Sequence, residues 1–233
     1  MNKILCLILA RGGSKGIKNK NIIKLGKLPL IAWTIKEALK SKKKLDVYLS
    51  TDSKKIANIG KKYGAQVPFI RPKKFAKDNS SSVDAIEHAV NFLKNKGLNY
   101  DYVLLLEPTS PLRDYKDIDN SINKFFSKNY DSLVSVSKLE AFHPDFLYKK
   151  NKIGFLSPFR KSKKKDIRRQ DLEPIYFLEG SIYISKITTL MKKRTFHHNK
   201  TIGIEMPKWK SIEIDDKIDL VHTEAIIKKK KLK

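Results

Sequence analysis

Short apolar runs alternate along the chain with segments whose apolar residues recur at helical spacing, and this alternation restricts the fold more than any other feature. Ile4–Ala10 and Tyr102–Leu106 are continuously apolar, as in strands that are covered on both faces of a sheet. Between them, Leu30–Lys42 and Val83–Leu93 have the periodicity of amphipathic helices. This order predicts a doubly wound, mostly parallel α/β sheet with right-handed crossovers.

Shorter elements extend the same pattern. Val47–Leu49 is a predicted strand, and Asp52 or Ser53 is expected to cap a helix over Ile56–Tyr63. Three further strands are predicted after Tyr102–Leu106, at Ser132–Val136, Ser181–Ile184 and Ser211–Ile214. At 233 residues, the chain fits a single α/β domain.

Residues 140–170 interrupt the alternation. Two stretches rich in aromatic residues, Phe142–Tyr148 and Phe155–Phe159, are followed by the basic run Arg160–Arg169. We interpret this region as an inserted arm. Exposed apolar side chains of this kind normally mark an interface, so we expect the arm to form a homodimer.

The formal net charge of +26 has two interpretations. It indicates either a polyanionic partner or a lysine-rich surface facing solvent, and the lysines are dispersed apart from the basic tail 228–233. A nucleic-acid-binding protein stays open as an alternative, although no motif of that class is present. Ile4–Ala10 is too short to span a bilayer, and the single cysteine, Cys6, excludes an internal disulfide. We therefore expect a cytoplasmic protein with no membrane partner.

The loop directly after the first predicted strand is glycine-rich and basic. It reads Arg11-Gly12-Gly13-Ser14-Lys15-Gly16, with Lys20 and Asn21 downstream. Adjacent glycines let backbone N–H groups form an anion-binding nest, and the cations suit a triphosphate. The pattern is neither a P-loop nor a dinucleotide fingerprint. The loop therefore predicts phosphate binding, against the alternative of a flexible basic loop.

This loop resembles the opening motif of the CMP-sialic acid synthetases, the acylneuraminate cytidylyltransferases, a family with legionaminic and pseudaminic acid relatives. Similar motifs follow in the family's order over some 200 residues: Leu49–Asp52; Arg71-Pro72 with Asp78 and Ser80–Ser82; Glu107–Arg113; His143-Pro144; Arg169–Leu172; Gly180–Ile184; and Ile212–Asp215 with Asp219.

The resemblance implies transfer of CMP from CTP to the anomeric hydroxyl of a nonulosonic sugar acid, with Mg²⁺ as cofactor and pyrophosphate as the second product. It implies these site residues: Arg11, Lys15, Lys20 and Asp215 as catalytic; Arg11, Gly12, Gly13, Ser14, Lys15, Lys20, Asn21, Arg71, Ser80 and Ser82 for CTP; Glu107, Thr109, Ser110, Arg169, Gln170, Glu179 and Tyr183 for the sugar; and Glu213 and Asp215 for the metal. A cytidylyltransferase for the eight-carbon octulosonate is the nearest alternative.

Several of these assignments have an ordinary structural alternative. Glu213 and Asp215 lie two apart on a predicted strand, so they share one face and suit a metal, but they could also simply face solvent. Ser80–Ser82 could cap the following helix, and Tyr183 could belong to the core. His197-His198 is not expected to share an ion, because adjacent strand residues face opposite sides.

The chain departs from the family pattern at three glutamates. Glu107 stands where many members carry glutamine, Glu179 where asparagine is common, and Glu213 in place of an aspartate. The first two changes leave the identity of the sugar open.

Overall fold

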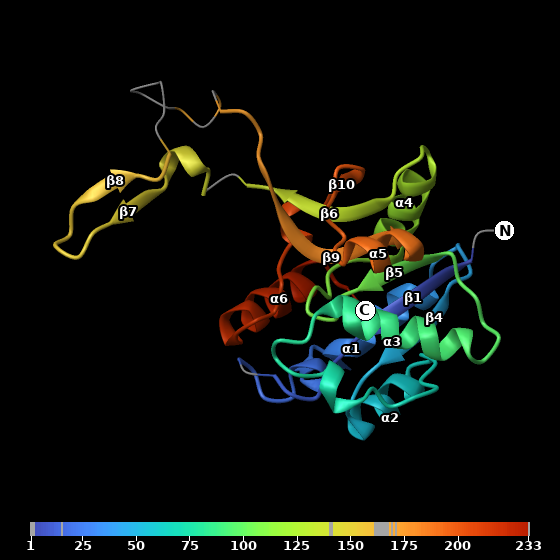
Figure 1. The fold of residues 1–233 in the computed structure, drawn as a ribbon. Coiled ribbons are helices and arrows are strands. Elements are labelled where there is room, and N and C mark those ends of the chain that lie inside the picture. The colour runs from blue at the N-terminus through green and yellow to red at the C-terminus, as the bar shows by residue number, and fades with distance from the viewer. Residues whose placement is uncertain are drawn as a thin grey trace.

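A six-stranded sheet forms the centre of the molecule (Figure 1). The computed structural model describes residues 3–14, 16–139, 142–160, 168, 170 and 172–232. The strand order is β10-β6-β9-β5-β1-β4, with β1 at Ile4–Leu9, β4 at Asp46–Ser50, β5 at Tyr102–Leu106, β6 at Ser132–Lys138, β9 at Tyr176–Lys186 and β10 at Thr201–Glu205. Within this sheet, β9 runs antiparallel to both of its neighbours and the other pairings are parallel, so the predicted mostly parallel sheet is confirmed.

Helices cover both faces of the sheet. The helices α1 (Leu30–Leu39), α2 (Lys54–Lys62) and α4 (Tyr115–Phe126) pack on one face, and α3 (Ser82–Lys94) and α5 (Ile187–Lys193) pack on the other. Alternate residues of β1 supply the two cores: Cys6 and Ile8 point to the first face, and Leu5 and Leu7 to the second. The doubly wound arrangement follows from a strand that is apolar at every position.

A third apolar cluster joins the N-terminal and C-terminal parts of the chain. It packs α6 (Lys217–Lys229) against the start of α1 and the short strands β2 (Lys24–Leu25) and β3 (Leu28–Pro29). Ile17 and Ile214 are both buried in this cluster. The loop after β1 and the segment before α6 are thereby held together.

Serine and aspartate side chains set where the helices begin. Ser53, one of the two predicted caps, accepts a hydrogen bond from the Ile56 backbone N–H, and Ser81 caps α3 in the same way. Asp114 and Asp216 form capping boxes at α4 and α6. Short 3₁₀ turns lie at η1 (Lys20–Ile22), η2 (Lys73–Phe75), η3 (Pro144–Phe146) and η5 (Lys208–Lys210).

The predicted arm contains a separate β-hairpin. Strands β7 (Tyr148–Lys150) and β8 (Leu156–Pro158) pair antiparallel and project away from the main sheet (Figure 1). Ile153 is 79% exposed and Phe155 72%. The hairpin therefore carries large apolar side chains that the described residues do not cover.

Two parts of the predicted layout were wrong or incomplete. The strand predicted at Ser211–Ile214 is an irregular extended segment, because the Ile214 N–H donates to the Thr109 carbonyl of a loop and not to a strand. Four described elements, α4, α5, α6 and β10, were not predicted from the sequence. In α4 the signal was present, because Ile118, Ile122 and Phe125 recur at helical spacing after the Asp114 cap. Within the described residues, no helix has the length and apolarity that crossing a bilayer requires.

Candidate active site

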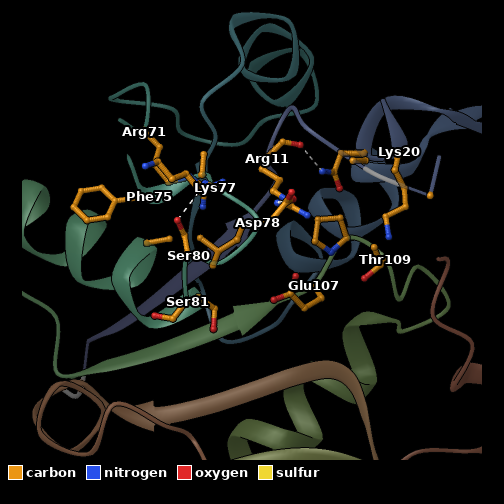
Figure 2. Close-up of a pocket in the computed structure, with 18 of the residues that line it drawn as sticks. Arg11, Lys20, Arg71, Phe75, Lys77, Asp78, Ser80, Ser81, Glu107 and Thr109 are labelled. Carbon is orange, nitrogen blue, oxygen red and sulfur yellow. Dashed lines mark hydrogen bonds and ion pairs between the residues drawn. The ribbon is translucent and has the colours of Figure 1, made fainter. Parts of the chain in front are cut away.

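A cavity of about 580 Å³ opens beyond the carboxyl ends of β1 and β5 (Figure 2). We call it the main cavity. Its wall comes from four segments: the loop after β1, the stretch that leads into α3, the loop after β5, and Asp215. In parallel α/β sheets this edge is where ligands bind. Figure 2 shows Arg71 and Phe75 toward one end of the cavity and Lys20 and Thr109 toward the other.

The loop after β1 is fixed by its own side chains. Asn21 Nδ2 donates to the Arg11 carbonyl at 3.0 Å, and the Gly12 N–H donates to Asp52 Oδ1 at 2.8 Å. The Gly12 N–H is thus directed to Asp52, and neither Gly12 nor Gly13 is among the residues that line the main cavity. Arg11, Ser14, Lys20 and Asn21 do line it, as the sequence predicted. Lys15 lies outside the described residues.

Gly16 is the glycine of this loop at which the structure leaves no room for a side chain. A Cβ at this position would lie 2.4 Å from the backbone oxygen of Asp215. The close approach brings the loop after β1 and Asp215 into one wall of the main cavity.

Among the described residues, four cations line the main cavity: Arg11, Lys20, Arg71 and Lys77. Arg11 Nη1 pairs with Asp78 Oδ1 at 2.5 Å, and Lys20 Nζ pairs with Asp215 Oδ1 at 2.8 Å. Arg71 is buried, its Nε has no hydrogen-bond partner among the described residues, and burial lowers the pKa of its guanidinium. A cation held in this way is available to an anionic or carbonyl-bearing ligand.

The segment before α3 contributes polar and aromatic groups. Ser80 Oγ donates to the Lys74 carbonyl and accepts from the Lys77 N–H, so it holds this turn together (Figure 2). Ser80 and Ser82 both line the main cavity, whereas Ser81 provides the helix cap. Phe75 and Lys77 also line it and were not predicted. An aromatic ring close to the Arg71-Pro72 motif could have indicated a surface for a nucleobase.

The loop after β5 is held in place by the buried side chain of Arg113. This side chain is 1% exposed, and its Nη1 donates to the carbonyls of Glu107, Ser110 and Ser181. The anchor sets the positions of Glu107 and Thr109, which line the main cavity. Ser110 is buried and is not part of the cavity wall.

Carboxylates gather where the main cavity meets β9. Burial, and next the Glu213 carboxylate, raise the pKa of Glu107 to about 7. Burial also raises the pKa of Glu213, although Thr109 Oγ1 donates to Glu213 Oε1 at 3.0 Å. A Cβ built on Gly180, whose φ is +79°, would lie 3.3 Å from Glu213 Oε2, so this backbone position is close to the carboxylate. Glu179 is 2% exposed and accepts hydrogen bonds from the backbone and hydroxyl of Ser181.

A second cavity of about 260 Å³ adjoins the main one. Ser81, Ser82 and Glu107 line both cavities. The remaining wall comes from α3, β5, β9 and the segment after α5: Val83, Leu105, Tyr183, Arg194, Thr195, Phe196 and His197. Arg194, Phe196 and His197 were missed, because nothing in their local sequence marks a binding site.

Tyr183 lies in this second cavity and also packs with the core cluster on that face of the sheet. Burial, and next the charges of the nearby glutamates, raise the pKa of its hydroxyl to about 12. The hydroxyl is therefore neutral at physiological pH and can donate a hydrogen bond. Tyr183 therefore belongs both to the core and to the wall of the second cavity, so both predicted roles apply to it.

Three further predicted sugar contacts lie outside both cavity walls or outside the described residues. Gln170 is exposed and lines neither cavity, and Arg169 lies outside the described residues. Glu179 lies behind the cavities and is not part of their walls.

The predicted metal pair is divided between two environments. Asp215 lines the main cavity beside Lys20, while Glu213 bonds Thr109 and faces Gly180. Ile214 between them is buried, so both carboxylates lie on the outer side of an extended segment. Within the described ranges, no group of three or more metal-binding side chains is preformed. This donor set fits a hard cation such as Mg²⁺ when phosphate oxygens and water supply the other ligands.

Comparison with known proteins identifies the family. A cytidylyltransferase family model matches residues 5–232. The chain belongs to the cytidylyltransferase family. It is 35% identical over 234 residues to the CMP-N,N'-diacetyllegionaminic acid synthase of Legionella pneumophila, covering 97% of this chain and 96% of the relative.

A second relative is longer than the chain. The N-acylneuraminate cytidylyltransferase of Streptococcus agalactiae serotype V is 33% identical over 222 residues, which is 94% of this chain but 52% of the relative. The chain thus spans about half the length of that cytidylyltransferase. A solved structure of CMP:2-keto-3-deoxy-manno-octonic acid synthetase complexed with CTP matches with a TM-score of 0.70 at 15% identity, covering 98% of this cytidylyltransferase and all of the neighbour. At that identity the match shows the shared fold.

Proposed function

We propose that this cytidylyltransferase transfers CMP from CTP to the anomeric hydroxyl of a nonulosonic acid and releases pyrophosphate. The observation that carries the proposal is the pair of adjoining cavities. The main cavity is lined by Arg11, Lys20 and Arg71, and it meets a smaller cavity at Glu107. A triphosphate in the first and a sugar acid in the second would bring the attacking hydroxyl to the α-phosphorus at their junction.

Arg11 and Lys20 are proposed to neutralise the phosphates of CTP. Both now hold carboxylates, Asp78 and Asp215, which a triphosphate can replace as a partner. Phosphoryl chemistry of this type depends on positioning and on stabilising the developing charge, not on a covalent intermediate. Lys15 stays a prediction of the same kind, and Arg169 stays a predicted contact to the sugar acid.

The base of CTP is proposed to lie at the end of the main cavity where Phe75 and Arg71 are. The Phe75 ring offers a stacking surface, and Ser80 and Ser82 are within the same wall. Cytosine presents an amino donor beside two acceptors, so backbone carbonyls near that amino group would separate it from uracil.

Asp215 and Glu213 are proposed to hold Mg²⁺. Asp215 is 73% exposed in its side chain and lines the main cavity, so it can reach a nucleotide-bound ion, and Glu213 follows on the same side of the segment. The ion would supply positive charge to the phosphate oxygens. Lys20 then keeps Asp215 oriented until nucleotide and metal arrive.

The sugar acid is proposed to be nonulosonic because the 30–35% identical relatives are named for acids of this class, whereas the octonic acid neighbour shares the fold at 15% identity. Glu107, Thr109 and Tyr183 line the cavities in which it would bind. A cytoplasmic location also stays a proposal.

We further propose a homodimer formed through the arm. The hairpin β7–β8 exposes Ile153, Phe155 and Leu156, which a symmetric contact would bury twice. Changing Ile153 and Phe155 together to Asp should convert a dimer to a monomer in sedimentation velocity. The matched change of Lys150 and Lys152, exposed lysines of the same hairpin, to Asp should leave the dimer intact. A monomeric wild-type protein with full activity would contradict the proposal.

Turnover is the direct test of the proposed reaction. Purified protein with CTP, Mg²⁺ and a panel of nonulosonic acids should release pyrophosphate and form a CMP-sugar seen by mass spectrometry, and UTP, ATP and GTP should serve poorly. Arg11→Ala should cost about 2–4 kcal/mol in transition-state stabilisation. Lys18→Ala, an exposed lysine of the same loop that lines neither cavity, is the control. The proposal fails if no acid in the panel yields product.

A further inference from the structure

The second cavity has an acidic group at its entrance in a protein of net charge +26. The Glu107 carboxylate lines both cavities, and among the described residues its side chain forms no hydrogen bond or ion pair. Figure 2 shows this side chain at the end of its strand, between Ser81 and Thr109. A carboxylate that is half-buried without a partner is costly, so its environment is set up for a ligand that supplies one.

Among the described residues, no cation forms an ion pair with the Glu107 side chain, although the charges of Arg113, Arg71 and Lys20 act on it. In the described wall of the second cavity, Arg194 is the basic side chain that is always charged. It already forms ion pairs with Asp84 and, at 2.8 Å, with Glu87. Lys20 is paired with Asp215. The rest of the second cavity's wall consists of small hydroxyls, apolar side chains, the neutral Tyr183 hydroxyl and the His197 ring.

A second buried carboxylate adds to the negative field. Glu179 is 2% exposed, and its Oε2 has no hydrogen-bond partner among the described residues. Its neighbour Gly180 packs against Glu213, and the charges of Glu107, Glu179 and Glu213 all act on Tyr183. The electrostatic field at the inner side of the second cavity is therefore negative, while the main cavity is lined by cations.

We infer that Glu107 determines which sugar acid is accepted, by selecting one that carries a cationic nitrogen substituent, an amine or an amidine. The inference rests on the proposed function and specifies its substrate class. A carboxylate only accepts hydrogen bonds, so it complements the two N–H groups of an amidinium. An N-acetyl group offers the carboxylate a single neutral N–H donor, and its carbonyl oxygen can only accept. The glutamine common at this position in the family can donate to that carbonyl; Glu107, when ionised, cannot.

The titration of Glu107 agrees with this assignment. Burial, and next the Glu213 carboxylate, raise the pKa of Glu107 to about 7, because the opposing charges of Arg113, Arg71 and Lys20 offset these effects only in part. A bound ammonium or amidinium would add positive charge beside the carboxylate and keep it ionised.

The test uses an isosteric substrate pair. N-acetimidoyl and N-acetyl derivatives of the same nonulosonic acid differ by the replacement of an amide oxygen with a charged nitrogen, and kcat/KM for CMP transfer is measured for both at each amino-bearing carbon. Wild-type protein should favour the N-acetimidoyl sugar at least tenfold at one carbon. Glu107→Gln should lower that ratio by about a hundredfold. Glu224→Gln, at an exposed glutamate of α6 that lines neither cavity, should leave it unchanged.

The outcomes separate this inference from the proposed function. A wild-type protein that turns over the N-acetyl sugars as well as or better than every N-acetimidoyl partner overturns the inference, whatever the variants do, while CMP transfer itself stands. A ratio that Glu107→Gln leaves unchanged assigns the selectivity to another group and overturns it too. Absence of product from both members of every pair removes the proposed function and the inference with it.

Discussion

Replacing Gly16 with alanine tests the contact that joins the loop after β1 to Asp215. The added Cβ would lie 2.4 Å from the Asp215 backbone oxygen, whereas ordinary contact begins near 3.4 Å, so the two segments must separate by 3.4 − 2.4 = 1.0 Å. Neither segment can yield freely. Ile17 is buried beside Gly16, Ile214 is buried and donates its N–H to the Thr109 carbonyl, and the Asp215 N–H donates to Asp219.

A displacement of 1.0 Å at this place separates Lys20 from Asp215 and shifts the proposed metal ligand relative to Arg11. Misplacement of about 1 Å in a catalytic arrangement costs on the order of a hundredfold in rate. This corresponds to about 2.7 kcal/mol. Forcing an extra methyl into a packed contact also costs about 1–3 kcal/mol of stability.

The assay is steady-state pyrophosphate release with CTP and the best sugar acid, alongside thermal unfolding of each variant. Gly16→Ala should lose about a hundredfold in kcat/KM. Gly13→Ala is the matched control, because a Cβ there meets no atom within 4 Å, and it should stay within threefold of wild type. Full activity of Gly16→Ala, or an equal loss at Gly13, would refute the contact as a determinant of the site.

Three further changes test the supports of the site. Arg113→Met removes a buried cation that donates to three carbonyls and should cost about 3–5 kcal/mol in urea unfolding, whereas a loss under 1 kcal/mol would contradict its anchoring role. Ser81→Ala should cost about 1 kcal/mol by removing the cap of α3, with Ser81→Asp as the rescue. Glu107→Gln should stabilise the protein by up to about 3 kcal/mol at pH 8 but little at pH 4. The folded protein retains at pH 4.5–7 a proton that the unfolded chain releases, so this group lowers stability as pH rises; an equal effect at both pH values would refute this.

The sheet and its position relative to the site could be predicted because their cause is local. Ile4–Leu9 and Tyr102–Leu106 are apolar at every position, which only a strand covered on both faces can satisfy. Polar residues that follow such strands must then lie at one edge of the sheet, and Arg11, Lys20 and Glu107 do line one cavity there. The helix caps were equally local.

Other elements were missed because their sequence signal is weak by itself. The residues of α6 include exposed apolar side chains, Ile218 and Val221, beside many lysines, and its packing face became apparent only against Trp33 and Leu25. The segment 211–215 has strand-like alternation, yet its Ile214 N–H donates to the Thr109 carbonyl of a loop and not to a strand.

The sequence by itself determined the doubly wound sheet, the glycine-rich basic loop after the first strand and the family to which its motifs belong, since each depends on residues that are neighbours along the chain. Only the tertiary structure decided that Gly16 touches Asp215, that Arg194 and His197 share a cavity with Tyr183, and that Glu107 faces both cavities without a partner. Residues 16 and 215 are almost the full chain apart. Their contact depends on where α6 packs, and so does the electrostatic field in which each carboxylate lies.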